Sequence, residues 1–112
     1  MSERSIRLYL QDIQDSGTAI IAYVEGIEFE SFRLDRMRCA AVIREFEIIG
    51  EAVGKLPDEV KATYPEVAWQ DIKDFRNLLI HEYFGVDLQI VWNAIRQELP
   101  RLLEVVMAMI DN

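Results

Sequence analysis

The sequence predicts an all-α fold, an antiparallel four-helix bundle with one additional short helix. Apolar residues recur at the three- and four-residue spacings of amphipathic helices along nearly the whole chain. Glycine and proline are scarce, with 5 and 3 residues, whereas an all-β fold needs many tight turns. Hydrophobic residues make up 51% of the 112 residues, which is enough to fill one core. We therefore expect a single helical domain over residues 1–112.

The first helix is expected over residues 3–25. Gly17 weakens its middle by up to about 1 kcal/mol relative to alanine. Gly26 suits the position after the last turn, where glycine commonly ends a helix. The apolar positions that we expect to face inward are Ile6, Tyr9, Leu10, Ile13, Ile20, Ile21 and Val24.

A second long helix is expected over residues 32–56. It should end at Leu56, because Pro57 disfavours helical geometry in the residue before it. Pro57 itself suits the first position of a short helix, which Tyr64-Pro65 should end. One stripe of the second helix carries Cys39, Val42, Ile43, Phe46, Ile49 and Val53.

A third long helix is expected over residues 68–84, ended by Gly85. Asp87 can cap a last helix. Pro100 lies inside that last helix and should bend it, since a proline ring clashes with the carbonyl four residues earlier. The candidate buried positions of these two helices are Trp69, Ile72, Phe75, Leu79, Phe84, Leu88, Val91, Trp92, Ile95, Leu99, Leu102, Val106 and Met109.

The composition excludes several classes of protein. A single cysteine, Cys39, rules out an internal disulfide framework and fits a reducing cytoplasm, where we expect the protein to be located. No apolar run approaches the roughly 18 residues that cross a membrane, and the first 25 residues carry charges throughout, unlike a signal peptide. With one histidine, His81, the chain is poorly equipped for a zinc site. We expect no metal and no cofactor.

The net charge of −8 disfavours nucleic acid as a ligand, because phosphates attract basic surfaces. The charge is uneven, however, because residues 33–44 contain four arginines and one acid, Asp35. This segment suits either a basic strip that holds a short RNA or a solvated helix face. The four arginines are Arg33, Arg36, Arg38 and Arg44.

The stretch from Trp69 to Asp87 contains the pattern R-N-x3-H-x-Y, formed by Arg76, Asn77, His81 and Tyr83. The guanidinium of arginine is always positively charged, and its paired N–H donors match the spacing of phosphate oxygens. Histidine exchanges protons near neutral pH. The two together are sufficient for metal-free cleavage of RNA, in which histidine moves a proton and arginine stabilises the anionic phosphorus.

Helical geometry does not bring this pair together within one straight helix. At about 100° per residue, Arg76 and Tyr83 lie roughly 20° apart, whereas His81 lies about 140° from Arg76. Asn77 sits one turn before His81 and can orient its ring. Either the helix is distorted or a second copy of the chain completes the site. We favour a two-fold homodimer that lines one cleft with both Arg-His sets.

The same stretch resembles the R-x4-H-x-Y signature of the HepT-like toxins of the HEPN superfamily, with asparagine after the arginine. The resemblance covers nearly the whole chain, and the extended string is far more specific than its R-x4-H core. Its further residues are Phe29, Phe32, Ile49-Gly50-Glu51-Ala52, Leu56-Pro57, Tyr64-Pro65, Trp69, Ile72, Tyr83-Phe84, Val86-Asp87, Trp92 and Leu99-Pro100.

This resemblance implies a HEPN-like helical bundle that dimerises and works as the toxin of a toxin–antitoxin system. The implied activity is metal-independent endoribonuclease cleavage of cellular RNA, with Arg76 and His81 as catalytic residues. The implied partner is a small, MntA-like nucleotidyltransferase antitoxin that transfers AMP from ATP onto Tyr83. A bulky anion on Tyr83 would occupy the face that Arg76 shares and repel phosphate.

Other interpretations of the same residues stay open. The chain suits a non-catalytic substrate-binding partner of a nucleotidyltransferase, although such a module does not need the intact motif. It also suits a structural helical adaptor. Tyr83 can serve packing, and Asn77 can cap or stabilise its helix. Glu51 fits a partner in the cleft, but we favour a solvated or salt-bridged role for it.

Overall fold

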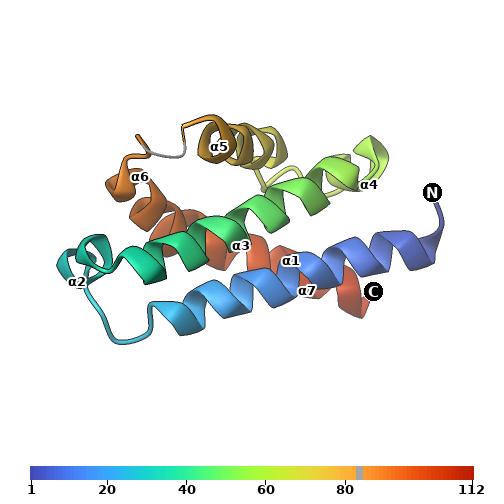
Figure 1. The fold of residues 1–112 in the computed structure, drawn as a ribbon. Helices are drawn as coiled ribbons and strands as arrows, with labels where there is room; N and C mark the ends of the chain where they lie inside the picture. Colours follow the sequence, from blue (N-terminus) through green and yellow to red (C-terminus); the bar gives the residue numbers. More distant parts are fainter. Residues whose placement is uncertain (83–84) are drawn as a thin grey trace.

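The computed structural model describes residues 1–82 and 85–112, and every secondary-structure element in them is helical (Figure 1). The predicted all-α class is confirmed. None of these helices is both long enough and apolar enough to cross a membrane. The elements are α1 (Glu3–Tyr23), α2 (Phe29–Leu34), α3 (Arg36–Lys55), α4 (Asp58–Ala62), α5 (Trp69–His81), α6 (Leu88–Asn93), the π-helical turn η1 (Ala94–Glu98) and α7 (Leu99–Asp111).

The long helices run up and down beside one another as a bundle (Figure 1). α3 lies between α1 and α5, and α7 packs against α1. α6, η1 and α7 follow one another without a break and form the fourth long segment. The core fills the space between these segments, and its largest fully buried side chains are Phe32, Ile13, Ile20, Ile49, Leu79, Leu99, Val42, Val53, Val91 and Val106.

Two glycines explain how α1 ends and packs. Gly26 has φ +76°, the left-handed conformation that the sequence predicts at this position. Gly17 has a role that periodicity does not reveal, because a Cβ there would collide with the Leu103 side chain of α7. The prediction that Ile21 faces inward is wrong, since that residue is 45% exposed.

The predicted start of the second long helix is wrong, because the chain forms two helices on either side of Asp35. α2 ends at Leu34, and α3 begins at Arg36. The turn allows Phe32 to be fully buried, with its ring centroid 5.2 Å from that of Trp92 on α6. Packing of this aromatic pair therefore accounts for an extra element that helical periodicity alone does not predict.

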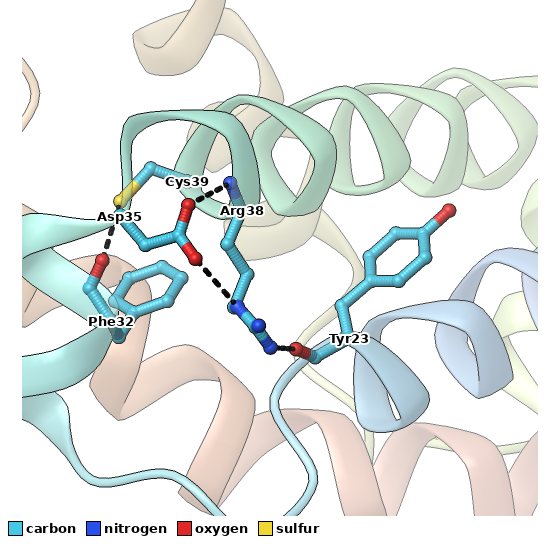
Figure 2. A network of polar contacts seen from close by, with 5 residues as sticks. All are labelled: Tyr23, Phe32, Asp35, Arg38 and Cys39. Atoms are coloured by element: carbon cyan, nitrogen blue, oxygen red, sulfur yellow. Dashed lines mark hydrogen bonds and ion pairs between the residues drawn. The ribbon is translucent and has the colours of Figure 1, made fainter.

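Polar contacts hold the junction between α2 and α3 (Figure 2). The Asp35 carboxylate accepts the backbone N–H of Arg38 at 3.0 Å and caps α3. The Arg38 side chain donates to the same carboxylate at 3.1 Å and to the carbonyl of Tyr23, which ties α3 to the end of α1. Cys39 donates its thiol to the Phe32 carbonyl at 3.1 Å.

The ends of α3 and α5 differ in how well the sequence predicts them. α3 stops at Lys55, and Leu56 is extended (φ −71°, ψ 139°), as expected before Pro57. α5 stops at His81, earlier than the predicted residue 84. The Gly85 N–H donates to the Glu82 carbonyl at 2.9 Å, so the terminating turn begins before the glycine. The prediction that Phe84 is buried falls outside the described residues.

The last helical segment begins as predicted, with the Asp87 carboxylate accepting the Gln89 N–H at 2.9 Å. The disturbance expected at Pro100 takes the form of η1, which immediately precedes α7. A π-helical turn widens the backbone locally, and this relieves the clash between a proline ring and the preceding turn.

The capping carboxylate of Asp35 makes the fold sensitive to acid. Hydrogen bonds from the Arg38 backbone and side chain hold the pKa of Asp35 below its ordinary value of 3.8. A carboxylate with a lowered folded pKa stabilises the protein above its unfolded pKa, and this stability is lost as the pH falls through the folded value. Asp35→Asn should therefore lower the thermal midpoint at pH 6, and the difference from wild type should shrink at about pH 2.5.

The check is thermal unfolding followed by circular dichroism at several pH values. Asp12→Asn makes the same charge change on the exposed face of α1 and should alter the midpoint much less. A difference between wild type and Asp35→Asn that stays constant down to pH 2.5 would contradict the account of the junction.

Candidate active site

α5 carries Arg76, Asn77 and His81 of the sequence motif and is fixed mainly to α3. At its first residue, the Trp69 indole N–H donates to the carbonyls of Lys61 and Tyr64 at 3.0 and 3.1 Å. In its middle, the Phe75 ring meets Phe46 of α3 edge-on, with centroids 5.3 Å apart. These contacts give α5 a defined rotation about its axis, and this rotation sets where Arg76 points.

α5 packs closely against α3 at Gly50. A Cβ on Gly50 would collide with the Cβ of Arg76 and lie 2.7 Å from its Cγ. A glycine costs about 1 kcal/mol in a helix interior, so its presence here has a packing reason. The absence of a side chain lets the stem of Arg76 lie directly against the α3 backbone.

The guanidinium of Arg76 lies beside α3, and only some of its N–H groups have a partner among the described residues. Its Nη1 donates to the Asn77 amide oxygen at 3.1 Å, and its Nη2 lies 3.7 Å from Glu51 Oε1. The side chain is 32% exposed. Its Nε is buried and has no hydrogen-bond partner within residues 1–82 and 85–112. The donors that an anion can use are therefore the remaining N–H groups of Nη1 and Nη2, because the buried Nε is out of reach.

His81 is the last residue of α5 and is exposed. Among the described residues no hydrogen bond joins it to Arg76, and the Asn77 amide oxygen serves Arg76 instead of the imidazole. The structure thus brings Arg76, Asn77 and Glu51 together and leaves His81 apart at the helix end. Tyr83, the predicted modification site, lies outside the described residues.

Glu51 has the salt-bridged role that the sequence analysis favours, but the sequence does not predict its partner, because the contact joins two different helices. The one sequence feature that points to it is an unexplained glycine, Gly50, in the interior of a long helix. An interior glycine commonly indicates that another segment packs closely there. Glu51 does form an ion pair, and its partner is the motif arginine.

Most of the arginines of residues 33–44 pair with carboxylates of their own chain. Arg33 lies 2.8 Å from Glu30, and Arg38 lies 3.1 Å from Asp35. The third, Arg44, lies 3.3 Å from Glu47. These pairs favour the solvated helix face over a basic strip for RNA.

A cavity of about 320 Å³ opens between α5 and the η1–α7 segment. Its walls are largely apolar, and the exposed charged residues around it are Glu66, Asp71, Glu98 and Arg101. Three carboxylates against one guanidinium make this cavity unsuited to a phosphate backbone. The Arg76 side of α5 is therefore the better location for an RNA phosphate.

The described residues contain no group of three or more histidine, cysteine, aspartate or glutamate side chains arranged to hold a metal ion. The cluster that the structure brings together offers a guanidinium, a carboxylate and an amide, and the imidazole of His81 lies at the end of the same helix. Such a set can bind a phosphodiester and move a proton.

Comparison with known proteins places the chain in a family. Residues 13–109 match the family model described as Ribonuclease HepT-like. A protein named "Probable ribonuclease HepT" from Thermococcus cleftensis is 39% identical over 100 residues, which cover 89% of this chain and 91% of the relative. A protein named "Putative RNase TTE0752" from Caldanaerobacter subterraneus is 44% identical over 96 residues, covering 86% of each chain.

A third relative, "Putative RNase MJ1380" from Methanocaldococcus jannaschii, is 34% identical over 102 residues, covering 91% of this chain and 94% of its own. No solved structure matches the chain significantly. The match to the family model and the relatives of similar length agree with the helical bundle that the structure shows. The chain belongs to the HepT-like ribonuclease family of the HEPN superfamily.

Proposed function

We propose that the protein is a metal-independent endoribonuclease that acts as the toxin of a toxin–antitoxin system. The observation that carries this proposal is the partly exposed Arg76 guanidinium, whose Nη1 and Nη2 groups retain unused donors, on the same helix as the exposed His81. Membership of a ribonuclease family supports RNA as the substrate. A non-catalytic binding partner of a nucleotidyltransferase is the alternative, and it predicts no cleavage.

The proposed reaction uses the 2′-hydroxyl of RNA as the nucleophile. This oxygen loses its proton, attacks the adjacent phosphorus and forms a 2′,3′-cyclic phosphate, while the bond to the 5′-oxygen breaks and that oxygen takes up a proton. His81 moves a proton at one of these oxygens. Arg76 holds the non-bridging phosphate oxygens and stabilises the charge that grows on them. Asn77 helps to orient the guanidinium.

The separate positions of Arg76 and His81 support a two-fold homodimer as part of this proposal. Cleavage needs both a proton acceptor and a proton donor, whereas each chain supplies one histidine. α5 also exposes two large apolar side chains near His81, with Leu78 41% and Ile80 43% exposed. A second copy that covers these side chains would bring its own His81 to the same cleft.

The proposed control is covalent modification by a nucleotidyltransferase antitoxin. The Tyr83 hydroxyl would attack the α-phosphorus of ATP, forming a tyrosyl–AMP ester and releasing pyrophosphate. The resemblance of the R-N-x3-H-x-Y string to the HepT-like signature is the support for this step. The added phosphate would compete with RNA for the Arg76 guanidinium.

The activity prediction concerns the two catalytic residues. The purified protein in excess EDTA should cleave single-stranded RNA and leave 2′,3′-cyclic or 2′/3′-phosphate ends. His81→Ala should lower the rate by roughly 10²–10⁴-fold, the usual contribution of a general acid or base. Arg76→Ala should be comparably slow, and Arg76→Lys should restore only part of the rate because an ammonium cannot make the forked contact.

Gel analysis of labelled RNA and mapping of its ends measure these effects. Arg4→Ala, on the exposed face of α1, removes an equivalent charge away from α5 and should cleave like wild type. Full activity of His81→Ala would defeat the enzyme assignment. Activity that chelation abolishes and magnesium or manganese restores would indicate a metal-dependent nuclease.

The assembly prediction is a dimer of about twice the 13.0 kDa chain mass. Ile80→Glu places a charge on the exposed apolar part of α5 and should produce a slow or inactive monomer. Ile21→Glu makes the same change at a similarly exposed position on α1 and should stay dimeric. Sedimentation at micromolar concentration distinguishes the two forms. A wild-type monomer that still cleaves RNA would contradict the dimer.

The regulation prediction concerns Tyr83. Incubation with ATP and a small, MntA-like nucleotidyltransferase should raise the intact mass of the protein by one or more AMP units. Tyr83→Phe keeps the ring but deletes the accepting hydroxyl and should not change in mass. Tyr23→Phe is the matched control, since the Tyr23 hydroxyl donates to Glu45 at 2.9 Å, and it should still be modified. Equal modification of Tyr83→Phe would remove Tyr83 from the mechanism.

A further inference from the structure

We propose that Glu51 is a positioning residue for Arg76, which it holds in place from α3 so that the guanidinium can meet a phosphate. The inference rests on the proposed role of Arg76 in RNA cleavage. It assigns a function to an acidic side chain that lies outside the R-N-x3-H-x-Y string.

The stem of Arg76 is fixed first, by its contact with Gly50. No side chain separates the α3 backbone from the Cβ and Cγ of Arg76 at this crossing. The next residue of α3 is Glu51, and its carboxylate lies 3.7 Å from Arg76 Nη2. Two consecutive residues of α3 thus act on the two ends of one arginine, Gly50 at the stem and Glu51 at the guanidinium.

The distance between Arg76 and Glu51 suits a carboxylate that orients the guanidinium without forming a hydrogen bond to it. At 3.7 Å the pair attracts electrostatically but exceeds the usual hydrogen-bond range. Arg76 Nε is buried and has no acceptor among the described residues, so it is not accessible to a ligand. The Nη2 group makes no hydrogen bond to Glu51 at this distance, so the carboxylate aligns the guanidinium and leaves the Nη2 donors for a phosphate.

Asn77 cannot replace Glu51 in this role. Its amide oxygen accepts from Arg76 Nη1 at 3.1 Å, but it is the next residue on the same helix. A contact within α5 moves with α5 and does not fix the guanidinium relative to the rest of the bundle. The Glu51 contact joins α5 to α3, which forms the centre of the molecule.

The neighbouring carboxylate on α3 provides a matched control. Glu47 lies one turn before Glu51, and its side chain is 19% exposed, against 53% for Glu51. It lies 3.3 Å from Arg44 on its own helix. Glu47→Gln therefore removes the same charge from the same helix without touching the Arg76 contact.

The experiment measures kcat and KM for RNA cleavage, together with the dissociation constant for an RNA whose reactive 2′-hydroxyl is replaced by hydrogen. Glu51→Gln should lower kcat roughly tenfold or more, because a misplaced catalytic group is costly even over short distances. It should also tighten binding of the non-cleavable RNA by roughly threefold, since a negative charge near the phosphate is gone.

Glu51→Asp retains the charge and should retain more of kcat than Glu51→Gln. Glu47→Gln should keep the wild-type kcat. Both Gln variants should unfold within a few degrees of wild type, because each keeps the shape of the side chain and loses a single ion pair with an arginine that is itself partly exposed. A slower reaction with tighter binding is a combination that general loss of structure does not produce.

Two kinds of failure are distinguishable. If the wild type does not cleave RNA, or if Arg76→Ala is as active as wild type, the proposed function fails. If wild type cleaves and Arg76→Ala is slow, but Glu51→Gln keeps the wild-type kcat, the positioning role alone is overturned. An equal loss of kcat in Glu47→Gln and Glu51→Gln also overturns it, because the effect then follows helix charge instead of the contact with Arg76.

Discussion

The close crossing of α3 and α5 at Gly50 is the constraint on which the candidate site depends. Any side chain at this position would collide with the Cβ of Arg76 and push the two helices apart. The same crossing brings the Glu51 carboxylate within 3.7 Å of the guanidinium. An arginine that projected freely from a surface helix would sample many rotamers, and ordering it on the substrate would carry an entropic cost. Here the protein fold has ordered much of that side chain beforehand.

Two chemically different surfaces lie on the two sides of α5, and adjacent residues of the helix contribute to one surface each. Phe75 packs edge-on against Phe46 and lines the apolar cavity, which Glu66, Asp71 and Glu98 make acidic at its exposed edge. Arg76, the next residue, turns toward Gly50 and Glu51. Because the helix turns by about 100° per residue, one anchored aromatic ring is enough to direct the arginine away from the cavity and toward the side that suits phosphate.

The sequence predicts the helices better than their contacts. Helical spacing identifies the buried stripe of α3 from Cys39 to Val53, and the local chemistry of Pro57 and Asp87 places an end and a start correctly. The break at Asp35 escapes prediction because it depends on Phe32 packing against Trp92, far along the chain. The motif likewise identifies Arg76 and His81 as candidates, but the ion pair with Glu51 requires the crossing of two helices, which local sequence does not encode. The roles of Gly17 and Gly50 are missed for the same reason, since each glycine accommodates a residue of another helix.

The intramolecular pairing of Arg33, Arg38 and Arg44 has a consequence for the thermodynamics of RNA binding. Each of these guanidinium groups already faces a carboxylate of its own chain, so bringing RNA close to them displaces few condensed cations from the phosphate backbone. The salt dependence of nucleic-acid affinity reflects that release of counterions, with a slope set by the number of phosphates neutralised. If a chain of net charge −8 engages RNA mainly through Arg76, as proposed, it holds the RNA by a few local contacts. Its affinity would then decline only gently as the ionic strength rises.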